Sequence, residues 1–135
     1  KKKEAKPIFV KIAPDLSQEE VDDIAALALD MKWAGIIISN TTLSREGLQT
    51  QTETINKIGA GGLSGRPLKN RSTEMLQYFH GSTEGKIPII ASGGIFTGED
   101  VKEKMEAGAS LIQVWTGFVY EGPLIVKKIC KSLLS

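Results

Sequence analysis

Ile87-Pro88-Ile89-Ile90-Ala91-Ser92-Gly93-Gly94 is the stretch that decides the fold, because an apolar run with the length of a buried strand ends there in a Ser-Gly-Gly turn. Three other stretches follow the same plan. Residues 7–13 contain a lysine, residues 35–40 end in Ser-Asn, and residues 111–117 end in Trp-Thr-Gly. In parallel sheets and barrels, ligands bind at the carboxyl ends of the strands. The sequence therefore predicts four parallel strands whose ends face one site.

Helical patterns alternate with these strands. Ser17 and Thr97 each have an acidic residue three positions later, which predicts a capped helix after the first strand and another after the third. Further helices are predicted over about 69–79 and from residue 123 through 134. The resulting order βαβαβαβα requires crossover connections and therefore parallel pairing. The nearly continuous apolar character of the strands predicts that both sheet faces are covered.

Four such units make an α/β fold that is half of a (β/α)8 TIM barrel, or else a small open sheet. A half-barrel exposes strand edges and interior, so we expect residues 1–135 to form one part of a larger barrel domain. Residues 43–66, between the second strand and the next helix, have the composition of a long loop. Loops of that length are commonly functional, which predicts an active-site loop that covers the strand ends.

Composition restricts the classes of function. The chain has 135 residues, 41% hydrophobic and 24% charged, with a net charge of +1, which gives no indication of nucleic-acid binding. The sequence contains neither a membrane-spanning stretch nor a targeting segment. Lys1, Lys2 and Lys3 are expected at a solvated end. Cys130, the only cysteine, is expected to be half-buried on the last helix, and no metal site is predicted.

Two of the strand ends carry polar side chains with alternative explanations. Lys11 interrupts an apolar strand, and it either reaches solvent or provides a cation for an electron-rich ligand such as a reduced flavin or a phosphate. Asn40 and Thr41 combine donors and acceptors that suit a planar polar ligand, although an ordinary turn uses the same residue types.

Glycines mark the remaining clusters. The run 61–65 allows close approach of the backbone to a ligand, or is merely flexible; a near-match to the dinucleotide fingerprint fails at Ser64. Gly93 and Gly94 end one predicted strand, and Trp115-Thr116 ends its neighbour. Consecutive glycines let backbone N–H groups converge on an anion, so this pair of strand ends predicts a phosphate site.

Taken together, the motifs resemble those of dihydroorotate dehydrogenase in order and spacing, over essentially the whole chain. They are Val-Lys-Ile-Ala-Pro-Asp at 10–15, Ser-Asn-Thr-Thr at 39–42, Gly-Gly-Leu-Ser-Gly at 61–65, Ala-Ser-Gly-Gly at 91–94 and Ala-Gly-Ala-Ser at 107–110. Lys-Ile-Ala-Pro-Asp at 11–15 is similar to the class 2, quinone-linked branch. The resemblance implies an FMN-binding flavoprotein that oxidises dihydroorotate to orotate in de novo pyrimidine biosynthesis, with ubiquinone as acceptor. It assigns strands five to eight, the C-terminal half of the barrel, to this chain.

The resemblance also implies roles for individual residues. The cofactor set, expected to contact FMN, comprises Lys11, Ser39, Gly65, Gly93, Gly94, Trp115 and Thr116. The substrate set, expected to hydrogen-bond the orotate ring, comprises Asn40 and Thr41. Ser39 stands where the family often has Thr, and Trp115-Thr116 stands where it usually has Tyr-Thr. The second departure removes a hydroxyl but leaves a contact through backbone N–H intact.

The implied oxidoreductase mechanism is proton removal from one dihydroorotate carbon and hydride transfer from its neighbour to flavin N5. The class 2 base is a serine on an earlier loop, so no catalytic residue is assigned to this chain, which is expected to be inactive alone. The expected partners are the N-terminal half of the enzyme as a companion chain, dihydroorotate or orotate, and ubiquinone through that half.

Membrane association is expected only through the N-terminal region, at the mitochondrial inner membrane if the enzyme is a eukaryotic class 2 member. Two alternatives remain: a class 1 or other FMN-barrel oxidoreductase, and a phosphate-binding half-barrel fragment that is inactive alone.

Overall fold

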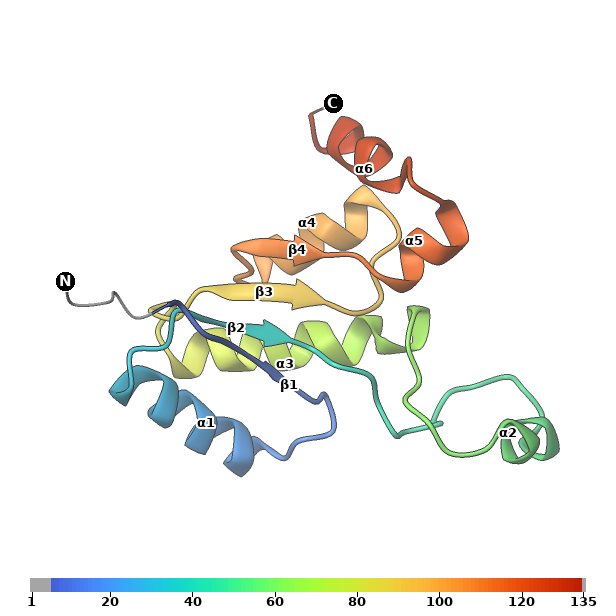
Figure 1. The fold of residues 1–135 in the computed structure, drawn as a ribbon, viewed down its shortest axis with the longest axis horizontal. Helices are drawn as coiled ribbons and strands as arrows, with labels where there is room; N and C mark the ends of the chain where they lie inside the picture. Colours follow the sequence, from blue (N-terminus) through green and yellow to red (C-terminus); the bar gives the residue numbers. More distant parts are fainter. Residues whose placement is uncertain (1–5, 135) are drawn as a thin grey trace.

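The computed structural model describes residues 6–134, so the expectation for Lys1, Lys2 and Lys3 lies outside the described residues. Its centre is a four-stranded sheet in which every neighbouring pair is parallel, as predicted (Figure 1). The strands, in spatial and chain order, are β1 (Phe9–Ile12), β2 (Gly35–Ile38), β3 (Ile89–Ser92) and β4 (Leu111–Gln113). Because the order in space equals the order in sequence, each crossover moves the chain one strand further in the same direction.

Helices form the connections between the strands. They are α1 (Gln18–Asp30), α2 (Thr52–Ile58), the 3-10 turn η1 (Arg66–Leu68), α3 (Lys69–Ser82), α4 (Gly98–Glu106), α5 (Thr116–Glu121) and α6 (Ile125–Leu133). Ser17 and Thr97 form the two predicted capping boxes at the starts of α1 and α4. Each hydroxyl accepts the backbone N–H three residues later, which satisfies a donor that the first helical turn leaves open.

Helices cover one face of the sheet. Ile36, Ile38 and Ile89 are fully buried on that face, together with Leu76 and Phe79 of α3. The buried residues of α1 belong to the same core, and Figure 1 shows α3 running behind the strands. Burial of these apolar side chains is the main stabilising contribution that holds α1 and α3 to the sheet.

The opposite face of the sheet is open. Phe9 of β1 is 42% exposed and Leu111 of β4 is 61% exposed, and Ile37 and Ile90 between them are only partly buried. The prediction that both faces are covered is therefore wrong for residues 6–134. Side chains alternate along a strand, so every second one lies on this open face. Several of these side chains are apolar, and for that reason the sequence predicted strands buried on both faces.

Residues 43–66 differ from the expected loop. They contain α2, which has no buried residue and no side-chain cap, and Figure 1 shows this part extending beyond the carboxyl ends of the strands. An antiparallel bridge between Thr42 and Leu63 closes the segment at its base. Arg45 also reaches across it to donate a hydrogen bond to the carbonyl of Gly61.

Two details after β4 also differ from the sequence analysis. The Trp-Thr-Gly cluster leads directly into the short helix α5, which begins at Thr116. The final helix α6 begins at Ile125 rather than at residue 123. Cys130 is exposed on α6 rather than half-buried, because the helix turns Ile125 and Ile129 toward the core instead. None of the helices within residues 6–134 has the length and apolar character that crossing a membrane requires.

Candidate functional site

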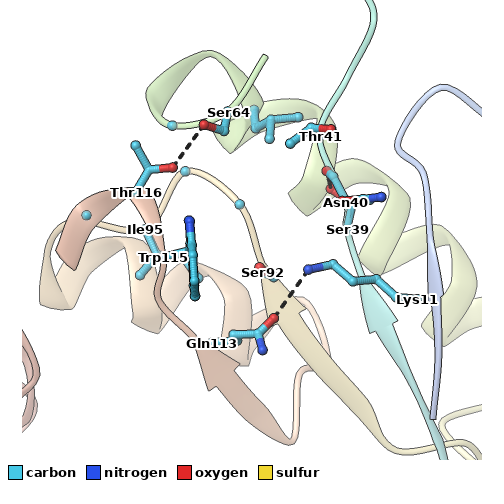
Figure 2. Close-up of a pocket in the computed structure, with 15 residues that line it drawn as sticks. Lys11, Ser39, Asn40, Thr41, Ser64, Ser92, Ile95, Gln113, Trp115 and Thr116 are labelled. Atoms are coloured by element: carbon cyan, nitrogen blue, oxygen red, sulfur yellow. Dashed lines mark hydrogen bonds between the residues drawn. The ribbon is translucent and has the colours of Figure 1, made fainter. Parts of the chain in front are cut away.

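A pocket of about 380 Å³ lies at the carboxyl ends of the strands, and residues at or just beyond the ends of all four strands line it (Figure 2). It brings together every residue that the sequence analysis selected. These are Lys11, Ser39, Asn40, Thr41, Gly65, Gly93, Gly94, Trp115 and Thr116. Parallel strands that end at one edge of the sheet produce this convergence, because each following loop must leave from the same side.

Lys11 lies on the open face of β1. Its ammonium donates a hydrogen bond to the side-chain oxygen of Gln113 on β4, at 3.4 Å (Figure 2). The other hydrogens of the ammonium remain free for a ligand, since this is the only side-chain bond that Lys11 makes among residues 6–134. Of the two explanations offered for Lys11, the structure favours neither alone, because the side chain is exposed and also lines the pocket.

The polar run after β2 is held by backbone contacts to both neighbouring strands. The Ser39 N–H donates to the carbonyl of Ser92 at 2.8 Å, and the Asn40 N–H donates to the carbonyl of Ile12 at 2.8 Å. The Ser39 hydroxyl donates to the carbonyl of Asn40 at 3.0 Å. The side chains of Asn40 and Thr41 are exposed at the pocket. A fixed backbone with exposed amide and hydroxyl groups suits recognition of a polar ligand.

Glycines supply the opposite wall. Gly65, Gly93 and Gly94 have φ values of +86°, +107° and +72°, a region that residues with side chains rarely adopt. The turn at Gly94 also packs closely on α3, because a Cβ placed there would lie 2.4 Å from the Cα of Lys69. Gly93 and Gly94 line the pocket, and α3 supports their turn tightly from behind.

The last strand contributes its end and the start of α5. Thr116 donates a hydrogen bond to the Ser64 hydroxyl at 3.1 Å, which joins α5 to the segment before α3 (Figure 2). A Cβ on Gly65 would lie 3.1 Å from the Cγ2 methyl of Thr116, so the two residues are already in contact. Trp115 is 78% exposed at the pocket margin.

Behind the glycine turn lies a cluster of charged residues on α3 and α4. The Lys69 ammonium pairs with Asp100 at 2.7 Å and with Glu103 at 3.0 Å, and hydrogen bonds to these two carboxylates raise the pKa of Lys69. The same contact with Lys69 lowers the pKa of Glu103. Burial by itself would raise the pKa of Asp100, but hydrogen bonds from Lys69 and from the Phe96 N–H hold it below its usual value. Lys69 is thus occupied by carboxylates and is not among the residues that line the pocket.

The side chains that line the pocket carry a net positive charge. Lys11 is the only charged residue among those lining it, and the remaining polar groups are hydroxyls, amides and backbone. A wall with one cation and no carboxylate favours an anionic or electron-rich ligand. No His, Cys, Asp or Glu lines this pocket, and no group of three or more such residues within 6–134 could hold a metal ion.

Several lining residues were not predicted from the sequence. Gln113, Ile95 and Leu68 were not selected, and Ser64 and Ser92 were noted only as parts of motifs. A signal for Gln113 was present, because in the predicted strand over 111–117 it stands two positions before Trp115, a spacing that predicts a shared face. Ile95 and Leu68 are apolar, and nothing in their local sequence distinguishes them from core residues.

Solved structures of similar chains share this fold. Over 95% of this chain, the structure superimposes with a TM-score of 0.87 and 45% identity on a crystal structure of DHODH from Eimeria tenella in complex with ferulenol. A ligand-free structure from the same organism gives a TM-score of 0.86 and 46% identity over 93% of this chain. The chain corresponds to 33% and 34% of those two proteins.

Curated relatives agree with this similarity. A protein from Nostoc punctiforme named dihydroorotate dehydrogenase (quinone) is 54% identical over 96% of this chain, and one of the same name from Christiangramia forsetii is 50% identical over 98% of it. The chain spans 36% and 38% of the lengths of these relatives. The sequence profile described as Dihydroorotate dehydrogenase matches residues 1–135. Because that match extends over the whole sequence, the chain belongs to the dihydroorotate dehydrogenase family.

Proposed function

We propose that this chain is the part of a quinone-linked, class 2 dihydroorotate dehydrogenase that binds orotate and most of the FMN phosphate region. The observation that carries the proposal is that all nine residues selected by family resemblance line one pocket at the carboxyl ends of the strands. The name shared by the curated relatives, dihydroorotate dehydrogenase (quinone), supports the choice of reaction and of acceptor.

The proposal includes strands five to eight of a (β/α)8 barrel. Its support is the open face of the sheet, where Phe9 and Leu111 are exposed on the two edge strands while helices cover only the other face. In a closed barrel such side chains fill the interior, and the free edges of β1 and β4 pair with further strands. The remaining strands belong either to the same polypeptide or to a companion chain.

The pocket fits FMN by the chemistry of its donors. Gly65, Gly93 and Gly94 line the pocket with backbone of positive φ, which suits backbone N–H contacts to a phosphate. Lys11 supplies positive charge at the strand end, and no carboxylate lines the pocket to repel an anion. Trp115 and Thr116 extend the same wall on the neighbouring strand end.

The substrate side of the site consists of Asn40 and Thr41. An amide side chain both donates and accepts, and a hydroxyl does the same, so the pair can match the carbonyl, N–H and carboxylate edges of orotate. Backbone hydrogen bonds of Asn40 to β1 and of Ser39 to β3 fix this run before a ligand binds. Binding therefore costs little conformational entropy of the backbone.

FMN, when bound, supplies the two-electron acceptor for oxidation of dihydroorotate to orotate. Lys11 favours negative charge that builds up on an electron-rich ring, and Asn40 and Thr41 orient the substrate beside it. Family resemblance implies that the base is a serine on an earlier loop, so we assign the general base to the rest of the enzyme. Quinone contact and any membrane association, including a mitochondrial inner-membrane location in a eukaryote, are likewise assigned to that part.

Residues 43–66 are proposed as the active-site loop. The Thr42–Leu63 bridge fixes the base of this segment beside Thr41, while α2 has no buried residue. A segment that is anchored at its base and weakly packed beyond it is suited to move over the strand ends.

The test uses the complete enzyme that contains this chain, purified as it occurs. Native mass spectrometry is expected to show one FMN per barrel and to reveal whether the rest of the barrel is a second polypeptide. Anaerobic addition of dihydroorotate should then bleach the visible flavin absorbance, and a soluble quinone should restore it. A folded barrel that holds no flavin, or a flavin that dihydroorotate does not bleach, would overturn the proposal.

A further inference from the structure

Lys104 of α4 is a lysine with no solvent exposure. Its ammonium donates three hydrogen bonds, to the carbonyl of Lys69 at 2.9 Å, to the Ser72 hydroxyl at 2.6 Å and to the Thr73 hydroxyl at 2.6 Å. All three acceptors are neutral, and Lys104 makes no ion pair among residues 6–134. Lysine is almost never fully buried without a charged partner, so the position calls for a physical reason.

The N-terminal end of α3, from Lys69 to Thr73, provides all three acceptors. The glycine turn after β3 rests on this same end of the helix, since a Cβ on Gly94 would meet the Cα of Lys69. The start of a helix carries partial positive charge, so an ammonium at this place is electrostatically unfavourable for helix α3 itself. Burial accordingly lowers the pKa of Lys104 to about 8. An apolar side chain of similar length would avoid this cost.

Ser72 connects the buried ammonium to the glycine turn. Its hydroxyl accepts from Lys104, which leaves its own hydrogen for the carbonyl of Gly93 at 3.2 Å or the carbonyl of Lys69 at 3.1 Å. When it donates to Gly93, that carbonyl points toward α3. In a trans peptide the next N–H points the opposite way, so the Gly94 N–H is directed away from α3. That N–H has no hydrogen-bond partner among residues 6–134, and Gly94 lines the pocket.

We propose that Lys104 and Ser72 are positioning residues that fix the Gly93–Gly94 peptide so that the Gly94 N–H faces the phosphate of the bound cofactor. Neither residue lines the pocket, so each acts through the turn and not by contact. The inference rests on the proposed function, because it takes the phosphate of FMN as the ligand of this turn. Asp100 assists from the same helix, since its carboxylate accepts the N–H groups of Phe96 and Thr97 at 2.9 Å and so holds the far end of the segment.

The test compares FMN with riboflavin, which lacks the phosphate, on the flavin-free form of the complete enzyme. Lys104→Met keeps an unbranched side chain that is one atom shorter and removes the ammonium. Ser72→Ala removes the link to Gly93 and leaves Lys104 two of its acceptors. Lys102→Met is the matched control, because Lys102 is exposed on the same helix. Dissociation constants are measured by quenching of flavin fluorescence, and thermal unfolding is measured in parallel.

Both Lys104→Met and Ser72→Ala are expected to weaken FMN binding by about tenfold or more, the effect of misaligning a hydrogen bond to a charged group. Riboflavin binding should stay within about twofold of the parent, and Lys102→Met should leave both constants unchanged. Equal weakening of FMN and riboflavin would mean general damage and would overturn the positioning role, as would unchanged FMN binding in both variants. If Lys104→Met does not fold, the FMN and riboflavin dissociation constants of Ser72→Ala alone test the positioning role. A parent enzyme that binds no flavin overturns the proposed function as well, which distinguishes the two failures.

Discussion

The ammonium nitrogen of Lys11 lies 3.4 Å from the side-chain oxygen of Gln113, although these residues stand on the first and last strands of the sheet (Figure 2). In a flat sheet, three strand spacings of about 4.8 Å would separate the two backbones by about 14 Å. The two long side chains cover that distance over Ile37 and Ile90, which stand between the edge strands in the register of the sheet. Polar side chains that meet above the open face are the geometry expected inside a barrel.

This contact predicts unequal effects at its two ends. Lys11→Met in the complete enzyme removes the only charged side chain of the pocket, and we expect flavin reduction by dihydroorotate to slow by about a hundredfold, or flavin to be lost on purification. Gln113→Leu leaves the charge of Lys11 in place and removes only the hydrogen bond that orients it. A smaller decrease in the rate of flavin reduction is therefore expected. Stopped-flow absorbance measures both. Lys127→Met on α6 serves as the control, and normal flavin retention and reduction in Lys11→Met would contradict the assignment.

Asn40 gives a prediction on the substrate side. Asn40→Ala removes an exposed amide at the pocket while its backbone bond to Ile12 is unaffected. We expect orotate to bind about tenfold to a hundredfold more weakly, because this charged ligand loses its hydrogen bonds to the Asn40 amide. Equilibrium titration of orotate against the oxidised complete enzyme measures the change. Asn70→Ala, an exposed position on α3 outside the pocket, should have no effect. Undiminished orotate affinity in Asn40→Ala would remove Asn40 from the substrate set.

Gly94 and Gly122 allow a matched test of the glycine turn. Both have positive φ, +72° and +75°, but a Cβ on Gly94 would lie 2.4 Å from the Lys69 Cα, whereas a Cβ on Gly122 meets nothing within 4 Å. Gly122→Ala should cost about 1–3 kcal/mol from the backbone conformation alone, because its ψ of −174° lies in a region that glycine alone normally adopts. Gly94→Ala should cost more, because backbone atoms of α3 must move, and it should also weaken FMN binding. Thermal unfolding and flavin titration compare the two variants. Equal losses of stability would mean that the turn at Gly94 is not tightly packed.

Much of the fold was predictable because local rules and tertiary packing agree. The capping residues Ser17 and Thr97 start α1 and α4 where the sequence analysis expected them. Helix α2 was missed because it buries no residue and has no side-chain cap, so its sequence carries no apolar periodicity. The open face was misjudged because Ile37, Ile90 and Leu111 give it the same apolar pattern as a covered face.

The site was predictable through its motifs and not through its support. Asn40 and Gly93 stand at strand ends, where position alone suggests a ligand. Gln113 was not predicted, although it ends β4, and Lys104 was not predicted because it lies inside α4. Lys104 stands three positions after the buried Val101 and four after Asp100, so helical spacing does place it on the inner face of α4. What the spacing cannot indicate is that an ammonium on that face finds three oxygen acceptors on α3.

Lys104 also predicts how stability depends on pH. Its pKa is about 8 in the folded chain and 10.5 ordinarily, because burial disfavours the charged form. Between these values the unfolded chain binds more protons than the folded one, so the free energy of unfolding rises with pH. From about pH 8 to about pH 10 the increase from this group is as much as about 2 kcal/mol. Above that range Lys69 and Tyr78 act in the opposite direction, since contacts with carboxylates raise the pKa of each in the folded chain.

Chemical denaturation of the complete enzyme at several pH values from about 8 to 10 measures this increase, with Lys104→Met as the comparison. The variant has no group to deprotonate at that position, so its stability should lack the rise and should exceed that of the parent most clearly at the lower pH, where the parent carries the buried charge. Lys102→Met should follow the parent curve, because its side chain is exposed. A stability curve of the parent that stays flat across this range would contradict the prediction, and so would a Lys104→Met curve that rises equally. Either result would mean that the Lys104 ammonium is well solvated or well paired in the folded enzyme. Its hydrogen bonds would then hold the buried network at no electrostatic cost.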